Sequence, residues 1–297
     1  MTNRNKKEKA IESMLFLSGA VAVVTLFLLC LFLFRDGILL FTKSDTTLLE
    51  FLTGKLWYPT ARPPLFGLVP LFLGSVIVTI GAIIFSVPLG IAAAVYIAEL
   101  ANPRVARVLK PFTEILAGIP SVVFGFFGLV VLVPIIRNSL DLTTGQTALT
   151  GSIMLGIMAL PTIISISEDA ISSVPRSIKE GSLALGSTKW QTIYKVTIPA
   201  ALSGISAAVM LGIGRAIGET MTVMMVTGNA AVIPGFPSGL FSPVRTMTAT
   251  IALEMGEVPQ GSAHFHALFA VGSVLFIITF IINIIASHIK KKYKFNL

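Results

Sequence analysis

The sequence predicts an all-α polytopic membrane protein with six transmembrane helices. Of its 297 residues, 54% are hydrophobic and only 12% are charged, against roughly 25% charged in an ordinary soluble domain. Apolar runs of about 20 residues, the length that a helix needs to cross a bilayer core, recur along the chain. Basic residues gather in alternate connections between these runs, so membrane topology explains the net charge of +8 better than nucleic-acid binding does.

Polar interruptions between the apolar runs define the candidate spans. The first run follows the basic stretch RNKKEK and is too long for the core of a signal peptide, so we expect a retained anchor. The second is long enough to be tilted or broken, and the fourth is short. The six expected spans are 14–34, 68–100, 112–136, 152–167, 201–227 and 267–287.

We expect three regions along the chain. An anchor helix and outer loop occupy 1–67, a transmembrane domain occupies 68–290, and a basic tail occupies 291–297. The single cysteine, Cys30, lies inside the first span, which excludes a disulfide framework and a cysteine metal site.

The distribution of lysine and arginine predicts the orientation. Fifteen of the 22 basic residues fall in the connections on the side that holds both termini, and six fall on the other side. Short cytoplasmic loops carry the excess of positive charge, so both termini are expected in the cytoplasm. The remaining basic residue, Arg215, lies within the fifth span.

Three prolines interrupt the apolar runs: Pro88 in SVPLG, Pro120 in AGIPSVVFG and Pro161 in MALPT. A proline removes a backbone hydrogen bond, and in a membrane such a break usually faces protein or a cavity rather than lipid. Each proline alone could be an ordinary kink. Three in one bundle favour breaks that line a pathway.

The segment 168–200 is long for a simple cytoplasmic connection. Pro175 can open a helix that ends at Gly186, a residue suited to a left-handed terminating conformation. Thr188 and Gln191 have the spacing of a capping box and predict a second helix.

One face of this second helix is expected to carry Trp190, Ile193, Tyr194 and Thr197, before Pro199 ends the pattern. An amphipathic helix pair lying on the membrane surface would explain the segment. A docking element would also explain it, because exposed aromatic anchors dominate the energetics of protein interfaces.

The same segment resembles the EAA loop of ATP-binding-cassette importer permeases. Glu180, Gly186 and Pro199 fall in register with its pattern, while Gly181 and Ser182 replace two alanines. In that family the loop forms the coupling helix that sits in a cleft of the ATPase subunit. The resemblance implies that Glu180, Gly186, Trp190, Tyr194 and Pro199 couple this chain to an ATPase.

The resemblance extends over nearly the whole chain. The stretches 117–129, 212–229 and 242–257 are similar to phosphate-specific permeases of the PstC type. This implies a type I ABC importer fold (MetI-like) that moves inorganic phosphate across the cytoplasmic membrane of a prokaryote. It also implies three partners: a PstA-type permease, PstB-type ATPases and a PstS-type external phosphate-binding protein. ATP and magnesium would act in the ATPase, with no cofactor bound by this chain.

The stretch GIGRAIGETM places Arg215 and Glu219 four residues apart near the bilayer centre. In a continuous helix the two would share a face and could pair. They could merely neutralise each other. Alternatively, the guanidinium could bind a passing oxyanion, because it stays protonated and can contact such an anion bidentately. Small residues around the pair would let another helix approach closely.

Other features of the sequence bear on ATP binding, metal binding and alternative functions. No G-x-x-x-x-G-K-[ST] motif occurs, so this chain is expected to be a transport subunit rather than an enzyme that binds ATP. His264 and His266 lack companion ligands for a metal, and the charges of Glu254 and Glu257 are expected to be solvated. A permease for another oxyanion such as sulfate, an autonomous secondary transporter and an intramembrane enzyme are the alternative functions.

Overall fold

The computed structural model describes residues 2–235 and 238–292. Within this part, six helices are long and apolar enough to cross a membrane, which confirms the predicted fold class. These candidate spans are Glu8–Lys43, Val69–Leu100, Ser121–Ser139, Ala148–Ser172, Lys189–Gly218 and Ala263–His288. Most of the predicted basic tail, 293–297, lies outside the described residues.

Helices dominate the described part of the chain, and one small hairpin accompanies them. The elements in order are α1 (Thr2–Lys43), α2 (Leu48–Thr53), β1 (Trp57–Tyr58), β2 (Leu65–Phe66), α3 (Val69–Val95), η1 (Tyr96–Leu100), α4 (Pro103–Ala117), α5 (Ser121–Phe127), η2 (Gly128–Leu132), α6 (Val133–Ser139), α7 (Ala148–Ser172), α8 (Arg176–Ala184), α9 (Lys189–Thr192), η3 (Ile193–Thr197), α10 (Ile198–Gly218), α11 (Met221–Val226), η4 (Ser238–Phe241), α12 (Met247–Glu254) and α13 (Ala263–Lys292).

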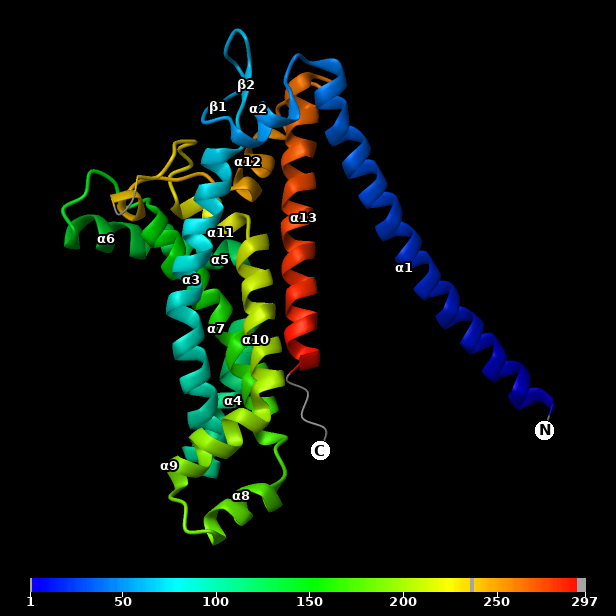
Figure 1. Ribbon diagram of the computed structural model, residues 1–297, viewed down its shortest axis with the longest axis vertical. Helices are drawn as coiled ribbons and strands as arrows, with labels where there is room; N and C mark the ends of the chain where they lie inside the picture. The colour runs from blue at the N-terminus through cyan, green and yellow to red at the C-terminus, as the bar shows by residue number, and fades with distance from the viewer. Residues whose placement is uncertain (1, 236–237, 293–297) are drawn as a thin grey trace.

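The first part of α1 points away from the bundle, and the second half of α1 packs against α13 (Figure 1). Edge-to-face ring pairs join the two helices, with centroids 5.4 Å apart for Phe32 and Phe269. Gly37 lies so close to α13 that a side chain there would collide with the hydroxyl of Ser273 and press on the backbone of Ala270. The preceding apolar side chains, such as Phe16 and Phe27, are exposed in the single chain.

A compact layer covers the outer end of the bundle. Strands β1 and β2 pair antiparallel, with Trp57 opposite Phe66. Thr47 and Glu50 form a complete capping box that starts α2, and Phe51 of α2 is fully buried beside the hairpin. This layer packs on α12 and α13 and closes the first of the hydrophobic clusters.

Helix α7 lies at the centre of the bundle and packs against both α3 and α10. Glycines make these contacts close: a side chain at Gly81 of α3 would collide with Ser152, and one at Gly212 of α10 would collide with Ile163. Residues on both sides of the predicted span are also helical, so α7 is 25 residues long. The predicted short fourth span, 152–167, is therefore corrected.

The predicted breaks at two of the three prolines are wrong. Pro88 lies inside α3 and Pro161 lies inside α7, and both helices continue through them. Pro88 is exposed and Pro161 is buried in the single chain. Prolines are tolerated inside membrane helices, because other groups can satisfy the carbonyl that loses its backbone donor.

Pro120 does mark a break, and it corrects the third span. The predicted helix 112–136 begins instead at Ser121, because α4 ends at Ala117 and Pro120 caps α5 with an extended backbone. Helix α4 is a separate amphipathic helix at the inner end of the bundle. The sequence prediction counted the apolar face of α4 as part of the following span, because hydropathy does not register the break between them.

The inner end of the molecule gathers several segments far apart in sequence. Helices α8 and α9 lie there together with both ends of the described chain (Figure 1). Between α9 and α10, the π-helical turn η3 continues the helix without interruption, so Pro199 falls in the first turn of α10. Pro199 therefore lies inside a continuous helix, Lys189–Gly218, rather than ending one.

Candidate functional site

Arg215 contacts the middle of helix α7. Its Nη1 donates a hydrogen bond to Oγ1 of Thr162 over 3.2 Å. Thr162 lies near the middle of the 25 residues of α7, so at about 1.5 Å per residue it is some 15 to 21 Å from either end of that helix. The structure thus puts the guanidinium deep within the membrane-spanning bundle, where an isolated charge is costly.

The predicted pairing of Arg215 with Glu219 is wrong. Helix α10 ends at Gly218, and Glu219 is an extended capping residue with φ −68° and ψ 131°. The two residues therefore do not share a helical face. In the described part of the chain, Arg215 forms no ion pair and has Thr162 as its side-chain hydrogen-bond partner.

Glu219 belongs to the break between α10 and α11. Its Oε1 accepts a hydrogen bond from the backbone N–H of Thr222 over 3.1 Å, and its backbone carbonyl accepts one from Thr248 Oγ1 over 2.9 Å. The hydroxyl of Thr222 donates to the carbonyl of Ser121 at the start of α5. Hydroxyl groups thus satisfy the backbone where α5, α11 and α12 meet, and the predicted continuous span 201–227 is corrected.

The two rows of small residues on α10 have different surroundings. The row containing Ala208, Gly212 and Ala216 is buried, and Gly212 lies against α7. Gly214 and Gly218 are exposed, and a side chain added at either would meet nothing nearby. Arg215 lies between these rows, so one side of its surroundings is open in the single chain.

The predicted two-helix coupling segment is confirmed as a structure. Gly186 ends α8 with φ +84°, and backbone bonds from Gly186 and Ser187 return to the carbonyls of Leu183 and Ser182. Thr188 and Gln191 form both bonds of the expected capping box. These local signals fix the sharp turn between α8 and α9.

The aromatic side chains of this segment point into solvent. Trp190 is 65% exposed and Tyr194 is 73% exposed, although both are residue types that normally bury much of their surface. Glu180 on α8 is also exposed. Inward-facing Ile193 is buried under the end of α3. The segment therefore presents an unpartnered aromatic surface on a fixed base.

Ion pairs hold the helices of this inner end together, and the sequence did not predict them. Lys179 Nζ of α8 lies 2.6 Å from Glu99 Oε1 in η1. Lys110 Nζ of α4 lies 2.6 Å from Glu168 Oε2 and 2.7 Å from Asp169 Oδ1. Hydrogen bonds from Lys110 to Asp169 and Glu168 hold the pKa of its ammonium group above the usual range. The partners are far apart in sequence, so spacing could not have found them.

A second cluster joins the outer loops. Glu254 accepts hydrogen bonds from Trp57 Nε1 at 3.1 Å and from Arg245 Nη1 at 2.6 Å, and its Oε2 lies 2.7 Å from His264 Nε2. The expectation that the charge of Glu254 is solvated is therefore wrong. His266 lies apart from His264, facing Lys43 and Asp36 of α1.

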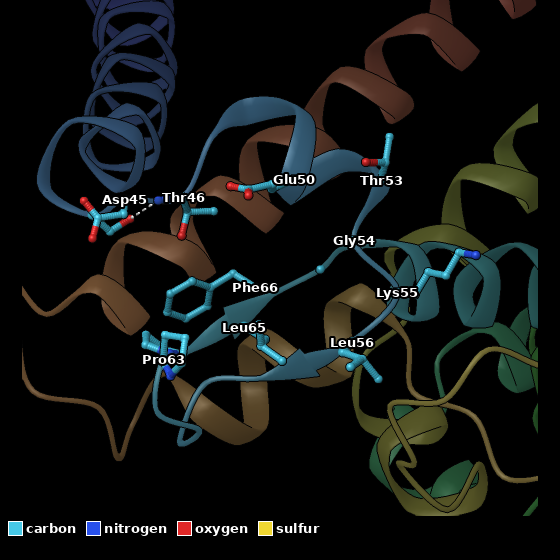
Figure 2. A pocket seen from close by; sticks show the side chains of 13 residues that line it. Asp45, Thr46, Glu50, Thr53, Gly54, Lys55, Leu56, Pro63, Leu65 and Phe66 are labelled. Atoms are coloured by element: carbon cyan, nitrogen blue, oxygen red, sulfur yellow. Dashed lines mark hydrogen bonds between the residues drawn. The ribbon is translucent and has the colours of Figure 1, made fainter.

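An open groove of about 610 Å³ lies in the compact layer at the outer end of the bundle, between α2 and the β1–β2 hairpin (Figure 2). Asp45, Glu50 and Lys55 contribute charge to its lining, and Phe66 lies on its floor. The N–H and hydroxyl of Thr47 donate to the Glu50 carboxylate, and these bonds hold its pKa below the usual range. The groove therefore combines charged and apolar lining residues.

The structure thus combines six candidate spans, an intramembrane cation and an exposed aromatic segment at one end, as expected of a multi-pass membrane transport component. Residues 86–295 match the family described as binding-protein-dependent transport system inner membrane component. The chain belongs to this family.

Comparison with individual proteins agrees with this assignment. The chain is 41% identical over 282 residues to the probable ABC transporter permease protein YqgH of Bacillus subtilis, covering 95% of this chain and 88% of that protein. It is 37% identical to the phosphate transport system permease protein PstC of Mesorhizobium japonicum, covering 80% and 77% respectively. A solved structure of the MetNI methionine ABC transporter in inward-facing conformations matches with a TM-score of 0.58 and 20% identity, covering 75% of this chain and 94% of that chain. The fold is therefore that of MetI-like ABC importer permeases.

Proposed function

We propose that this chain is the permease subunit of an ATP-driven importer of inorganic phosphate. The observation that carries the proposal is the Arg215 guanidinium, deep in the bundle and without a carboxylate partner among the described residues. Such a cation supplies several N–H donors for a tetrahedral oxyanion. The similarity to PstC proteins supports phosphate as that anion.

In this proposal a PstA-type permease faces the open side of α10 near Gly214 and Gly218, and the anion passes Arg215 between the two subunits. PstB-type ATPases dock on the exposed aromatic surface of Trp190 and Tyr194 and use ATP with magnesium, and this chain itself binds no cofactor. A phosphate-loaded PstS-type protein docks on the outer loops. The inner end with α8, α9 and both termini lies in the cytoplasm, as the distribution of basic residues also favours.

Glu219 has a separate role in this proposal. Because its carboxylate accepts the N–H of Thr222, it fixes the break that ends α10 just beyond Arg215. One oxygen could also accept a hydrogen bond from a protonated phosphate, a bond that fully ionised sulfate cannot donate. Glu219 would thereby favour phosphate over sulfate.

Phosphate uptake by cells that express this chain with its three partners tests the proposal. Arg215→Lys should lower uptake at least tenfold, and Glu219→Gln should lower it and reduce the preference for phosphate over sulfate, with co-purification of the ATPase confirming assembly. Wild-type uptake by both variants would overturn the anion site. Uptake that persists without the ATPase would instead favour a secondary transporter.

A further inference from the structure

The hydroxyl of Thr162 differs in its hydrogen bonds from the hydroxyls of Ser152 and Thr227. Ser152 and Thr227 donate to backbone carbonyls four residues earlier, the usual arrangement for hydroxyls in membrane helices. Among the described residues, Thr162 makes no such bond and instead accepts one from Arg215. Its oxygen is thus used by a side chain from another helix, 53 residues away in sequence.

The consequence for Arg215 is a fixed orientation. An arginine side chain has many rotamers, and ordering them has an entropic cost of up to about 2 kcal/mol. A hydrogen bond to a single Nη1 holds one edge of the planar guanidinium against α7 and leaves its other N–H donors available. A hydroxyl suits this task, because unlike a carboxylate it does not neutralise the cation.

We propose that Thr162 is a positioning residue for the anion-binding guanidinium of Arg215, so that the hydroxyl of Thr162, rather than its shape, supports transport. This inference rests on the proposed function. The bond links α10 to the central helix α7 at mid-depth, where Arg215 has no other side-chain hydrogen-bond partner among the described residues. Thr162 is half-buried and adjoins buried Pro161, so its position in α7 is well defined.

Two substitutions distinguish the contribution of the Thr162 hydroxyl from that of the shape of its side chain. Thr162→Val keeps the branched shape and removes the acceptor, whereas Thr162→Ser keeps the acceptor and removes a methyl group. We expect Thr162→Val to lower the maximal phosphate uptake rate at least fivefold, with ATPase co-purification unchanged, and Thr162→Ser to retain at least half of the wild-type rate. The maximal rate is the relevant quantity, because an external binding protein would set the apparent affinity for phosphate.

The outcomes distinguish this inference from the proposed function. Wild-type uptake by Thr162→Val, or equal losses in Thr162→Val and Thr162→Ser, would overturn the role of the hydroxyl. If Arg215→Lys is impaired while Thr162→Val is not, the positioning role fails and the anion site stands. If Arg215→Lys transports like wild type, the anion site itself fails. Where Arg215→Lys retains measurable uptake, adding Thr162→Val should cause no further loss, since coupled residues are non-additive.

Discussion

Lys179 Nζ lies 2.6 Å from Glu99 Oε1, and this ion pair fastens α8 to the inner end of the helix that continues from α3. Both side chains are largely buried, with 19% and 13% of their surfaces exposed. A displacement of α8 can therefore be transmitted to α3 through this ion pair as well as through apolar packing.

Breaking this pair should weaken the mechanical link. Removing one partner of a buried ion pair costs about 3 kcal/mol or more, because the other charge is left unpaired. We expect Lys179→Met to lower the amount of substrate moved per ATP in the reconstituted complex and to lower its melting temperature.

Lys195→Met is the matched control for the melting temperature, because Lys195 is exposed on η3 and should tolerate the change. The double variant Glu99→Gln, Lys179→Met should recover part of the stability, since neither charge is then left alone. Equal behaviour of Lys179→Met and Lys195→Met would contradict this link.

The turn between α8 and α9 requires a glycine. At φ +84°, Gly186 occupies the left-handed region, where a side chain costs roughly 1 kcal/mol. Gly186→Ala should therefore lower the melting temperature and weaken ATPase binding in a pull-down titration. Gly181→Ala, within α8 and with open space around it, should be neutral or stabilising because alanine favours helix. A harmless Gly186→Ala would show that the turn can rearrange.

The exposed aromatic surface should supply affinity for the ATPase. Trp190→Ala should weaken ATPase binding by about 2 kcal/mol or more, the loss typical of a central aromatic anchor, while leaving the fold intact. Tyr58→Ala is the comparison, since Tyr58 is 61% exposed at the outer end. The titration should detect no change for Tyr58. Similar affinities for both variants would exclude Trp190 as an anchor.

The attachment of α4 to α7 should be insensitive to pH near neutrality. Hydrogen bonds to Asp169 and Glu168 raise the pKa of Lys110, so the stabilising contribution is complete below the unfolded pKa of about 10.4 and is lost only as pH rises through the higher folded value. The melting-temperature difference between wild type and Lys110→Met should stay constant from about pH 6 to 9. A difference that shrinks by pH 9 would contradict this.

Local signals predicted much of the coupling segment. Gly186, Thr188 and Gln191 act through their immediate neighbours, so their spacing alone indicated the turn and the second helix. The periodicity of the second helix was misleading, because it placed Trp190 and Ile193 on one face, whereas Trp190 is exposed and Ile193 is buried.

The intramembrane site was harder to predict because its geometry is not local. Periodicity placed Glu219 one turn above Arg215, but it does not register a helix end inside an apolar run. Gly218 before a polar pair was the available signal, since glycine is common where helices end. The contact of Arg215 with Thr162 and the four-residue cluster around Glu254 join distant segments, and one sequence carries no record of such contacts.

Only the second half of α1 packs against the rest of the bundle, and this has a consequence for the first half. Because the first span touches its neighbours mainly beyond Leu29, the other five spans keep their mutual packing without its first half. The apolar side chains of that half are therefore available to contact lipid or the surface of another protein. The packed bundle thus consists of five spans and the second half of α1, with the first half extending from it.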